Sequence, residues 1–482
     1  MAERLIEHWK LAVLRVGLDL SSRTPAVTSR LDAFPEGVRH TYWTRRDPLR
    51  AFGLAETIEP PDQLTVPREL ADDVTETMNG ALGGESALWL RLEPPYGYLG
   101  AVPWEDLIDR IDVPILRVPD RLPVPAALGT TWSIAIAVSA PQGATWGADH
   151  INAFVDQLQA QVTVPLEVDV FADSGTYQLL RPDLDPAPPH IRIHAPGGAR
   201  AAHAHRSHRL PLGQRRMENL RPIIDPDDGR LVWADWIVEG LAGRAVRAVH
   251  IVAEGFFDRD RPMLSITPDP GDAVARDGCS LISGEDVWRL ADNLGAPLVS
   301  LGSPVPGESD VAVRMMADTL GEQRPGPTVY SCLPRDPAGR VLAQAHGFLA
   351  GPRGGSHLPR GSCLFAYVQP ESVREVLTEP LLPQHTGQEQ RVLPQVGGRT
   401  RSLDAPAPDA PVDAVTQTYG GLPEVPVWVA SSSRFLETQQ ADLGSALSVQ
   451  GKGKLTKHAY DSGTEEALSE IQELIERHAR ES

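Results

Sequence analysis

The chain has 482 residues, more than one ordinary hydrophobic core can serve, so two or more domains are expected. Its 64 Asp and Glu outnumber its 45 Lys and Arg, and the formal net charge of −19 argues against a nucleic-acid-binding body. Only three cysteines occur, which excludes a disulfide framework and suits a reducing compartment.

The N-terminus and the hydropathy pattern predict where the protein resides. The first ten residues mix charged and apolar side chains, so no signal peptide is expected. Nowhere do about 18 apolar residues follow one another, so no membrane span is expected either. We therefore expect a cytoplasmic protein whose partners are neither membranes nor nucleic acids.

In chain order, residues 1–84 form an N-terminal extension with an alternating strand at 11–20 and a helical stretch at 68–78. Beyond it the pattern sharpens into short apolar runs, at 87–92, 115–118, 133–140, 166–171, 248–253, 297–301 and 328–331. Helices with 3.6-residue periodicity lie between several runs, and one of them has Ser283 as its N-cap and Gly295 past its end. This alternation predicts an α/β fold with a mainly parallel sheet and helices on both faces.

The C-terminal part of the chain changes character. Residues 378–426 are rich in Pro, Gln and Gly and are expected to form a linker. Residues 427–482 are expected to form a small module, with an amphipathic helix at 465–479 that follows a capping box starting at Ser462. A lone helix of this length is marginal in water, so it should dock on its own chain or on a protein partner. Its apolar side comprises Leu468, Ile471, Leu474 and Ile475.

A histidine-dense basic segment occupies residues 190–216. Its histidines could surround a metal ion, but interleaved arginines would repel a cation, so no metal site is expected. We expect a solvated basic insertion that could receive an acidic protein partner. No cofactor is expected, because residues 351–355 lack the Lys-Ser/Thr ending of a phosphate-binding loop. The histidines are His190, His194, His203, His205 and His208, and the arginines include Arg200, Arg206, Arg209, Arg215 and Arg216.

The order of several short motifs along the chain bears on the fold. Pro103-Trp104-Glu105 follows an early strand, residues 250–255 end a buried strand at a glycine, and residues 278–287 enter a helix. Residues 296–303 form an apolar strand that ends in small residues, and residues 327–349 add a closing strand and helix. The ordered set resembles the CHAT family, caspase-like peptidases of clan CD. The resemblance covers roughly residues 85–370 and implies a caspase-like domain over 85–377.

The same resemblance implies an altered active site. It places Glu254 where the family has its catalytic histidine and Ser303 where the family has its cysteine nucleophile. A serine hydroxyl needs a well-matched base, and a carboxylate with its usual pKa of about 4 is a poor one. We expect strands 248–253 and 297–301 to be parallel neighbours, with Glu254 and Ser303 at one sheet edge and no peptidase activity that depends on them.

Three functions stay open at this point. The leading one is a catalytically degenerate protein that acts through protein–protein contacts, which the resemblance associates with bacterial signalling or conflict (defence) systems. The first alternative is an active cysteine peptidase with a rearranged dyad, in which Cys332 is the nucleophile and His346 or His250 the base. The second is a ligand- or peptide-binding sensor that keeps the cleft without chemistry. The remaining cysteines, Cys279 and Cys363, are expected to lie in a loop and in strand packing.

Overall fold

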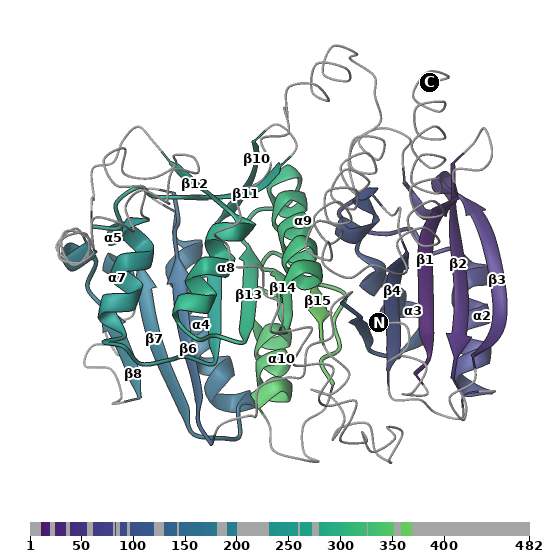
Figure 1. Cartoon of the computed structure of the whole chain (residues 1–482), viewed down its shortest axis with the longest axis horizontal. Coiled ribbons are helices and arrows are strands. Elements are labelled where there is room, and N and C mark those ends of the chain that lie inside the picture. The colour runs from purple at the N-terminus through teal and green to yellow at the C-terminus, as the bar shows by residue number, and fades with distance from the viewer. Residues whose placement is uncertain are drawn as a thin grey trace, which may run out of the picture.

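A large, mostly parallel sheet organises the protein (Figure 1). The computed structural model describes residues 11–19, 25–34, 39–54, 61–80, 82, 87–93, 97–119, 130–141, 144–180, 190–199, 231–258, 261–271, 279–324, 326–350 and 358–368. Within these residues, twelve strands form one sheet in the order β3-β2-β1-β4-β5-β15-β14-β13-β9-β6-β7-β8. The predicted α/β class with a mainly parallel sheet is confirmed.

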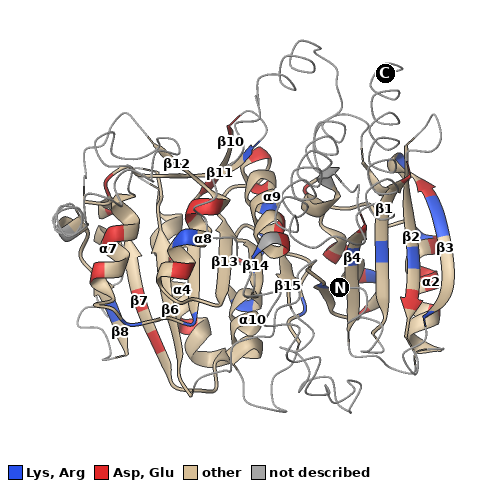
Figure 2. Ribbon diagram, in the orientation of Figure 1, with Lys and Arg blue, Asp and Glu red and all other residues tan. Residues whose placement is uncertain are grey.

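The central part of the sheet contains seven strands, of which five match predicted apolar runs and two, at 191–194 and 364–367, match none. All neighbours from β14 to β8 are parallel, and only β15 runs antiparallel to β14. Figure 2 shows that β13 and β14 carry no charged residue, which suits strands buried on both faces. The strands are β6 (Trp132–Val138), β7 (Leu166–Ala172), β8 (Ile191–His194), β9 (Ala248–Val252), β13 (Leu298–Ser303), β14 (Thr328–Cys332) and β15 (Leu364–Tyr367).

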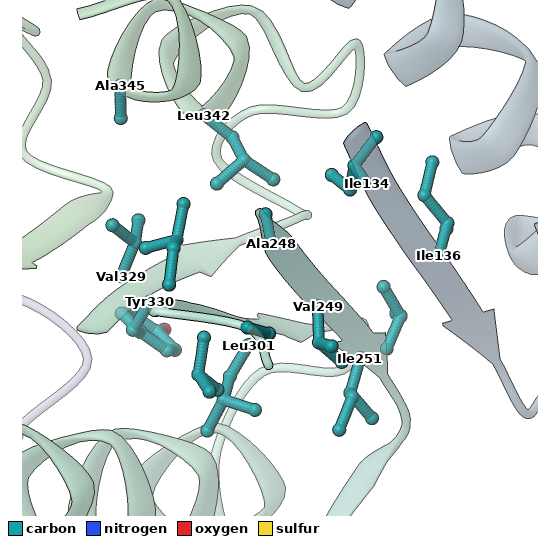
Figure 3. Packing of buried hydrophobic residues seen from close by; sticks show 14 of the residues in the cluster. Ile134, Ile136, Ala248, Val249, Ile251, Leu301, Val329, Tyr330, Leu342 and Ala345 are labelled. Carbon is teal, nitrogen blue, oxygen red and sulfur yellow. The ribbon is translucent and has the colours of Figure 1, made fainter. Parts of the chain in front are cut away.

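Helices cover both faces of this part of the sheet. On one face the ring of Phe154, from α4 (Trp146–Gln161), packs against His250 of β9, and α10 (Arg340–Ala350) lies beside α4. On the other face Tyr330 of β14 donates a hydrogen bond to Asp310 of α9 (Glu308–Gln323). Figure 3 shows apolar side chains of the central strands pointing to both sides. We call these the α4/α10 face and the α9 face.

Two further helices complete the α9 face. In α7 (Val232–Gly240), Trp236 packs edge-to-face on Phe171 of β7. α8 (Gly284–Asn293) begins at the predicted N-cap, where the Ser283 hydroxyl and the Asp286 side chain form a reciprocal capping box. Past its end, Gly295 has a φ of 63°, a left-handed conformation that glycine adopts without strain.

The N-terminal strands continue the main sheet. β1 (Val13–Asp19) pairs in parallel with β4 (Leu88–Glu93), which in turn pairs with β5 (Ile115–Arg117). β2 (Ala26–Ala33) and β3 (His40–Pro48) add antiparallel strands outside β1. The strands of the predicted N-terminal extension are therefore hydrogen-bonded into the same sheet as the strands that follow them.

A second hydrophobic cluster lies under these N-terminal strands. Leu14 and Val16 of β1 and Leu90 of β4 belong to it, together with Val74 of α2 (Arg68–Asn79) and Trp104. Short turns complete this part, namely η2 (Leu49–Phe52), η3 (Gly97–Ala101), η4 (Trp104–Leu107) and α3 (Ile108–Ile111).

A small antiparallel sheet stands beside the carboxyl ends of the central strands. It consists of β10 (Glu254–Asp258), β11 (Arg261–Ile266) and β12 (Ser280–Ser283), in that order. α9 packs against both β10 and β11. Two short helical segments, α5 (Ser174–Gln178) and η6 (Pro196–Gly198), lie in loops.

Several predicted features lie outside the described residues. They are the linker at 378–426, the module at 427–482 with its helix at 465–479, and the part of the basic segment from residue 200 to residue 216. Among the residues that are described, no helix combines the length and the apolar character needed to cross a membrane.

Candidate functional site

The carboxyl ends of β9, β13 and β14 lie side by side and bring the predicted site residues to one sheet edge. β9 and β13 are parallel neighbours in the register Val252 to Gly302, which confirms the predicted adjacency of strands 248–253 and 297–301. Glu254 begins β10 two residues after β9 ends, and Ser303 ends β13. Cys332 ends β14 and is the register partner of Ser303.

Ser303 lies on the α9 face of the sheet. Side chains alternate along a strand, so Leu301 and Ser303 of β13 share a face with their register partners Tyr330 and Cys332. Tyr330 bonds Asp310 of α9, which identifies that face. Ser303 is fully buried there.

Glu254 lies on the opposite side of its own strand from α9. A Cβ built on the next residue, Gly255, would lie 2.1 Å from the Ser309 carbonyl oxygen, so that side of β10 is pressed against α9. Because side chains alternate, Glu254 points away from α9. The two positions therefore share a sheet edge but not a side, and within the described residues no hydrogen bond or ion pair joins them.

The Ser303 hydroxyl already has a partner. Its Oγ donates a hydrogen bond to the Val305 carbonyl oxygen at 3.2 Å, and its side chain is inaccessible to solvent. A nucleophilic serine instead needs a general base that accepts its proton. A backbone carbonyl holds the hydroxyl in place without activating it.

Gly302, and not Ser303, is the β13 residue whose Cβ direction points toward the α4/α10 face. An added Cβ there would lie 2.9 Å from Leu333 Cδ1 and from Val252 Cγ2, and 3.3 Å from His250 Cε1. A side chain at this position would require its neighbours to shift. The β13 residue directly opposite His250 is Ser300, and its hydroxyl is fully buried.

Cys332 lies in a small pocket on the α9 face, away from every described histidine. Burial, together with Asp310, raises the pKa of its thiol to about 11, and the Arg335 backbone N–H, the Tyr330 hydroxyl and the Arg335 charge offset only part of this. The thiol is therefore protonated at neutral pH and a weak nucleophile. No histidine lines this pocket, whose residues are Asp62, Pro103, Asp310, Arg314, Tyr330, Cys332, Arg335, Ser362, Cys363 and Phe365.

The histidines proposed as alternative bases lie together on the α4/α10 face. His250 Nε2 is 3.0 Å from His150 Nε2, and His250 Nδ1 is 2.9 Å from Ser300 Oγ. His346 of α10 packs edge-to-face on Phe154, and neither of its ring nitrogens has a hydrogen-bond partner among the described residues. All three rings are buried in an apolar layer.

Burial keeps these three imidazoles neutral. It lowers the pKa of His150 to about 4 and that of His346 to about 3. It also lowers the pKa of His250 well below its usual value, and the two neighbouring histidines add to the effect. The cluster therefore packs as neutral rings, with the sheet between it and Cys332. The structure does not bring Cys332 together with His250 or His346.

The Pro-Trp-Glu motif has a structural role. Both carboxylate oxygens of Glu105 accept hydrogen bonds from the buried Arg117 guanidinium, at 2.7 and 2.9 Å. Arg117 also donates to the carbonyl of Val102 and to the hydroxyl of Tyr367, and it stacks over the ring of Phe365. This network joins the motif to β5 and β15, and so holds the two parts of the sheet together.

The described start of the basic segment is ion-paired. Asp169 of β7 is fully buried and accepts hydrogen bonds from Arg192 and Arg244, and His194 Nε2 lies 2.9 Å from the same carboxylate. His190 contacts the side-chain amide of Gln159. In the described part of the chain, no group of three or more His, Cys, Asp or Glu side chains could hold a metal ion.

Comparisons with known proteins add no relative: no protein-family model matches the chain, and no curated protein matches it. The candidate site therefore rests on geometry. Sequence reasoning missed Gly302, Arg117 and the neighbourhood of His150. Strand alternation counted outward from His250 could have identified Gly302, but no local pattern linked His150 on a helix to His250 on a strand.

The three thiols should differ sharply in reactivity. Cys279 is exposed, whereas Cys332 and Cys363 are buried, and burial raises the pKa of the Cys363 thiol to about 12. At neutral pH an alkylating reagent should modify Cys279 first and reach the other two only when urea unfolds the chain. Mass spectrometry of digested samples taken over time measures this order. Rapid modification of Cys332 in the folded chain would instead support the rearranged dyad.

Proposed function

We propose that this chain is a catalytically degenerate caspase-like protein that acts through protein–protein contacts, in the manner of a bacterial signalling or defence component. The observation that carries the proposal is the arrangement at the carboxyl ends of β9 and β13. Glu254 and Ser303 point to different sides, Ser303 is bonded to a backbone carbonyl, and Gly302 is tightly packed. A peptidase needs a nucleophile and a base that reach each other and the substrate. Ser300 Oγ does lie 2.9 Å from His250 Nδ1, but both residues are fully buried.

The alternative of an active cysteine peptidase receives no support from the geometry. A cysteine nucleophile needs a low pKa and an adjacent base. Cys332 has a raised pKa, and its pocket contains no histidine. The fold is nevertheless stabilised, because the buried Glu105–Arg117 pair connects the turn that contains the Pro-Trp-Glu motif to the sheet. A stable fold whose described residues place no nucleophile beside an accessible base suits a protein that presents surfaces to partners.

Peptide cleavage by the full chain tests this proposal. Incubation with a diverse peptide mixture, followed by mass spectrometry, should show no cut that exceeds the background of a heat-denatured sample. The variants Cys332→Ala, Ser303→Ala and Glu254→Gln should give the same result as the original chain. Cleavage that disappears only in Cys332→Ala would establish the rearranged dyad and overturn the proposal. Cleavage that disappears in Ser303→Ala or Glu254→Gln would overturn it by restoring the predicted dyad positions to catalysis.

A further inference from the structure

The strand β10 carries Glu254 and forms one edge of the small antiparallel sheet. Among the described strands it pairs only with β11, in the register Glu254 to Ser265 and Phe257 to Pro262. In an antiparallel pair, residues alternate between those whose main-chain groups bond the partner strand and those whose groups point outward. If the main-chain groups of one residue are known to point outward, the direction of these groups follows for every other residue of the strand.

Gly255 settles which residues of β10 point outward. Its N–H donates to Ser309 Oγ at 2.8 Å and so faces away from β11. Two residues further along, the main-chain N–H and C=O of Phe257 must point outward as well. This agrees with its register partner, Pro262, because proline has no N–H to donate to Phe257. Among the described residues, the N–H and C=O of Phe257 and the C=O of Gly255 have no hydrogen-bond partner, although Ser309 occupies the Gly255 N–H.

The side chains of β10 that point away from α9 form an acid–aromatic–acid stripe. They are Glu254, Phe256 and Asp258. Phe256 is 52% exposed, an unusual exposure for so large an apolar residue in the part of the chain that the structure describes. Asp258 is exposed too, with Arg261 of β11 opposite it in register, and Glu254 is half-buried opposite the neutral Ser265.

We propose that the outer edge of β10 binds an extended peptide segment of a partner protein, with basic side chains on either side of an apolar one. The added strand would bond the N–H and C=O of Phe257, because Ser309 occupies the edge beside Gly255. Its apolar residue would cover Phe256, and its basic residues would pair with Glu254 and Asp258. The inference builds on the proposed function, because it gives the proposed protein contact a location and a chemistry.

The net charge and the position of the strand favour this occupant. A chain with a formal net charge of −19 attracts cationic segments and repels acidic ones. Glu308, exposed in the first turn of α9 beside Ser309, adds a further negative charge near the edge. The open stretch is short, so hydrogen bonds alone would give weak binding, and the charged and aromatic side chains must supply specificity.

Fluorescence anisotropy with the full chain tests the proposal. The probe is a labelled nine-residue peptide in which Arg, Thr, Val and Thr alternate, compared with one that has Glu in place of Arg and one that is N-methylated at each Thr and each Val. The arginine peptide should bind saturably and less tightly as salt rises, and the other two should bind about tenfold more weakly or not at all. Mass spectrometry of the same samples shows whether the peptide stays intact.

A matched set of variants locates the binding surface. Phe257→Pro removes the outward N–H, and Phe257→Ala removes the same side chain but keeps the N–H, so the proline variant should bind about fivefold to tenfold more weakly than the alanine variant. Phe256→Ala should weaken binding about tenfold, whereas Leu179→Ala, at a residue 49% exposed elsewhere on the surface, should leave it unchanged. Glu254→Gln should flatten the salt dependence.

The outcomes separate this inference from the proposed function. Absence of binding, or equal binding by the Phe257→Pro and Phe257→Ala chains, overturns the edge site and leaves the degenerate peptidase untouched, provided that the peptide stays intact. Equal binding of the arginine and glutamate peptides overturns the stated chemistry of the partner. Cleavage of the bound peptide by the folded chain would overturn the proposed function instead. Circular dichroism and thermal melting of each variant confirm that it is folded before it is scored.

Discussion

Replacing Arg117 with alanine should lower the free energy of unfolding by about 3–5 kcal/mol, because it leaves the carboxylate of Glu105 buried without its partner. The guanidinium is almost fully buried and bonds Glu105, the carbonyls of Gly100 and Val102, and the hydroxyl of Tyr367. Burial opposes its charge, but Glu105 outweighs this and raises the pKa of Arg117. Burial also raises the pKa of Glu105, and the attraction of Arg117 offsets this only in part.

Urea unfolding followed by tryptophan fluorescence measures the Arg117→Ala effect. Arg360→Ala is a matched control, because Arg360 forms a 3.4 Å pair with Asp112 in which both side chains are largely exposed. Such surface pairs contribute about 0–1 kcal/mol, so the control should change little. An Arg117→Ala chain as stable as the Arg360→Ala chain would show that the buried network does not hold the two parts of the sheet together.

Acidification should destabilise the protein between about pH 6.5 and pH 3, with an onset well above the ordinary carboxylate pKa of about 4. Above pH 6.5 the three buried histidines are neutral in the folded and unfolded chains alike. Below it the unfolded chain binds protons at His150 and His346, whose folded pKa values are about 4 and about 3, while the folded chain stays neutral. Each such imidazole lowers stability by about 1.4 kcal/mol per pH unit within its window.

The variant His346→Leu isolates one imidazole of this group. It replaces a buried ring whose nitrogens lack partners among the described residues with an apolar side chain of similar size, so stability at pH 7 should hold or rise. The slope of unfolding free energy against pH should fall by about 1.4 kcal/mol per pH unit between pH 6.5 and about pH 3. An unchanged slope would mean that His346 titrates normally in the folded chain.

The carboxylates act differently. Burial raises the pKa of Glu322 to about 8, so this group opposes the histidine effect below neutral pH. Asp169 acts at lower pH than the histidines. Burial alone would raise the pKa of Asp169, but hydrogen bonds from His194, Arg192 and Arg244 outweigh it and hold that pKa well below its usual value. Its contribution to stability is present above its unfolded pKa of about 4 and is lost as pH falls further. A loss of stability already under way at pH 5 therefore reports histidines and not this carboxylate.

The central strands could be predicted from the sequence because they are buried on both faces. Continuous apolar runs marked β9 and β13, and the alternation with helices implied that they are parallel. The outer strands β2 and β3 could not be found in this way. β3 carries Arg45, Arg46 and Asp47, which suit an exposed sheet edge but conceal the strand from any pattern based on apolar residues.

The candidate site was predicted only in part. Sequence order correctly brought Glu254 and Ser303 to one edge of the sheet, because strand ends follow from strand order. It could not tell which side each residue faces, since a shift of one residue moves a side chain to the opposite face. The packing of Gly255 on α9 and the closed surroundings of Gly302 depend on contacts between distant segments, which no local motif records.

Rebuilding the predicted dyad tests the central claim most directly. In the double variant with Glu254→His and Ser303→Cys, the rate at which an electrophilic peptide probe labels the introduced thiol is compared with the rate in the single variant Ser303→Cys. We predict equal and slow labelling in both, because the two positions face different sides and position 303 is buried. Labelling accelerated about tenfold or more by the added histidine would show that the two side chains meet, and would contradict the account.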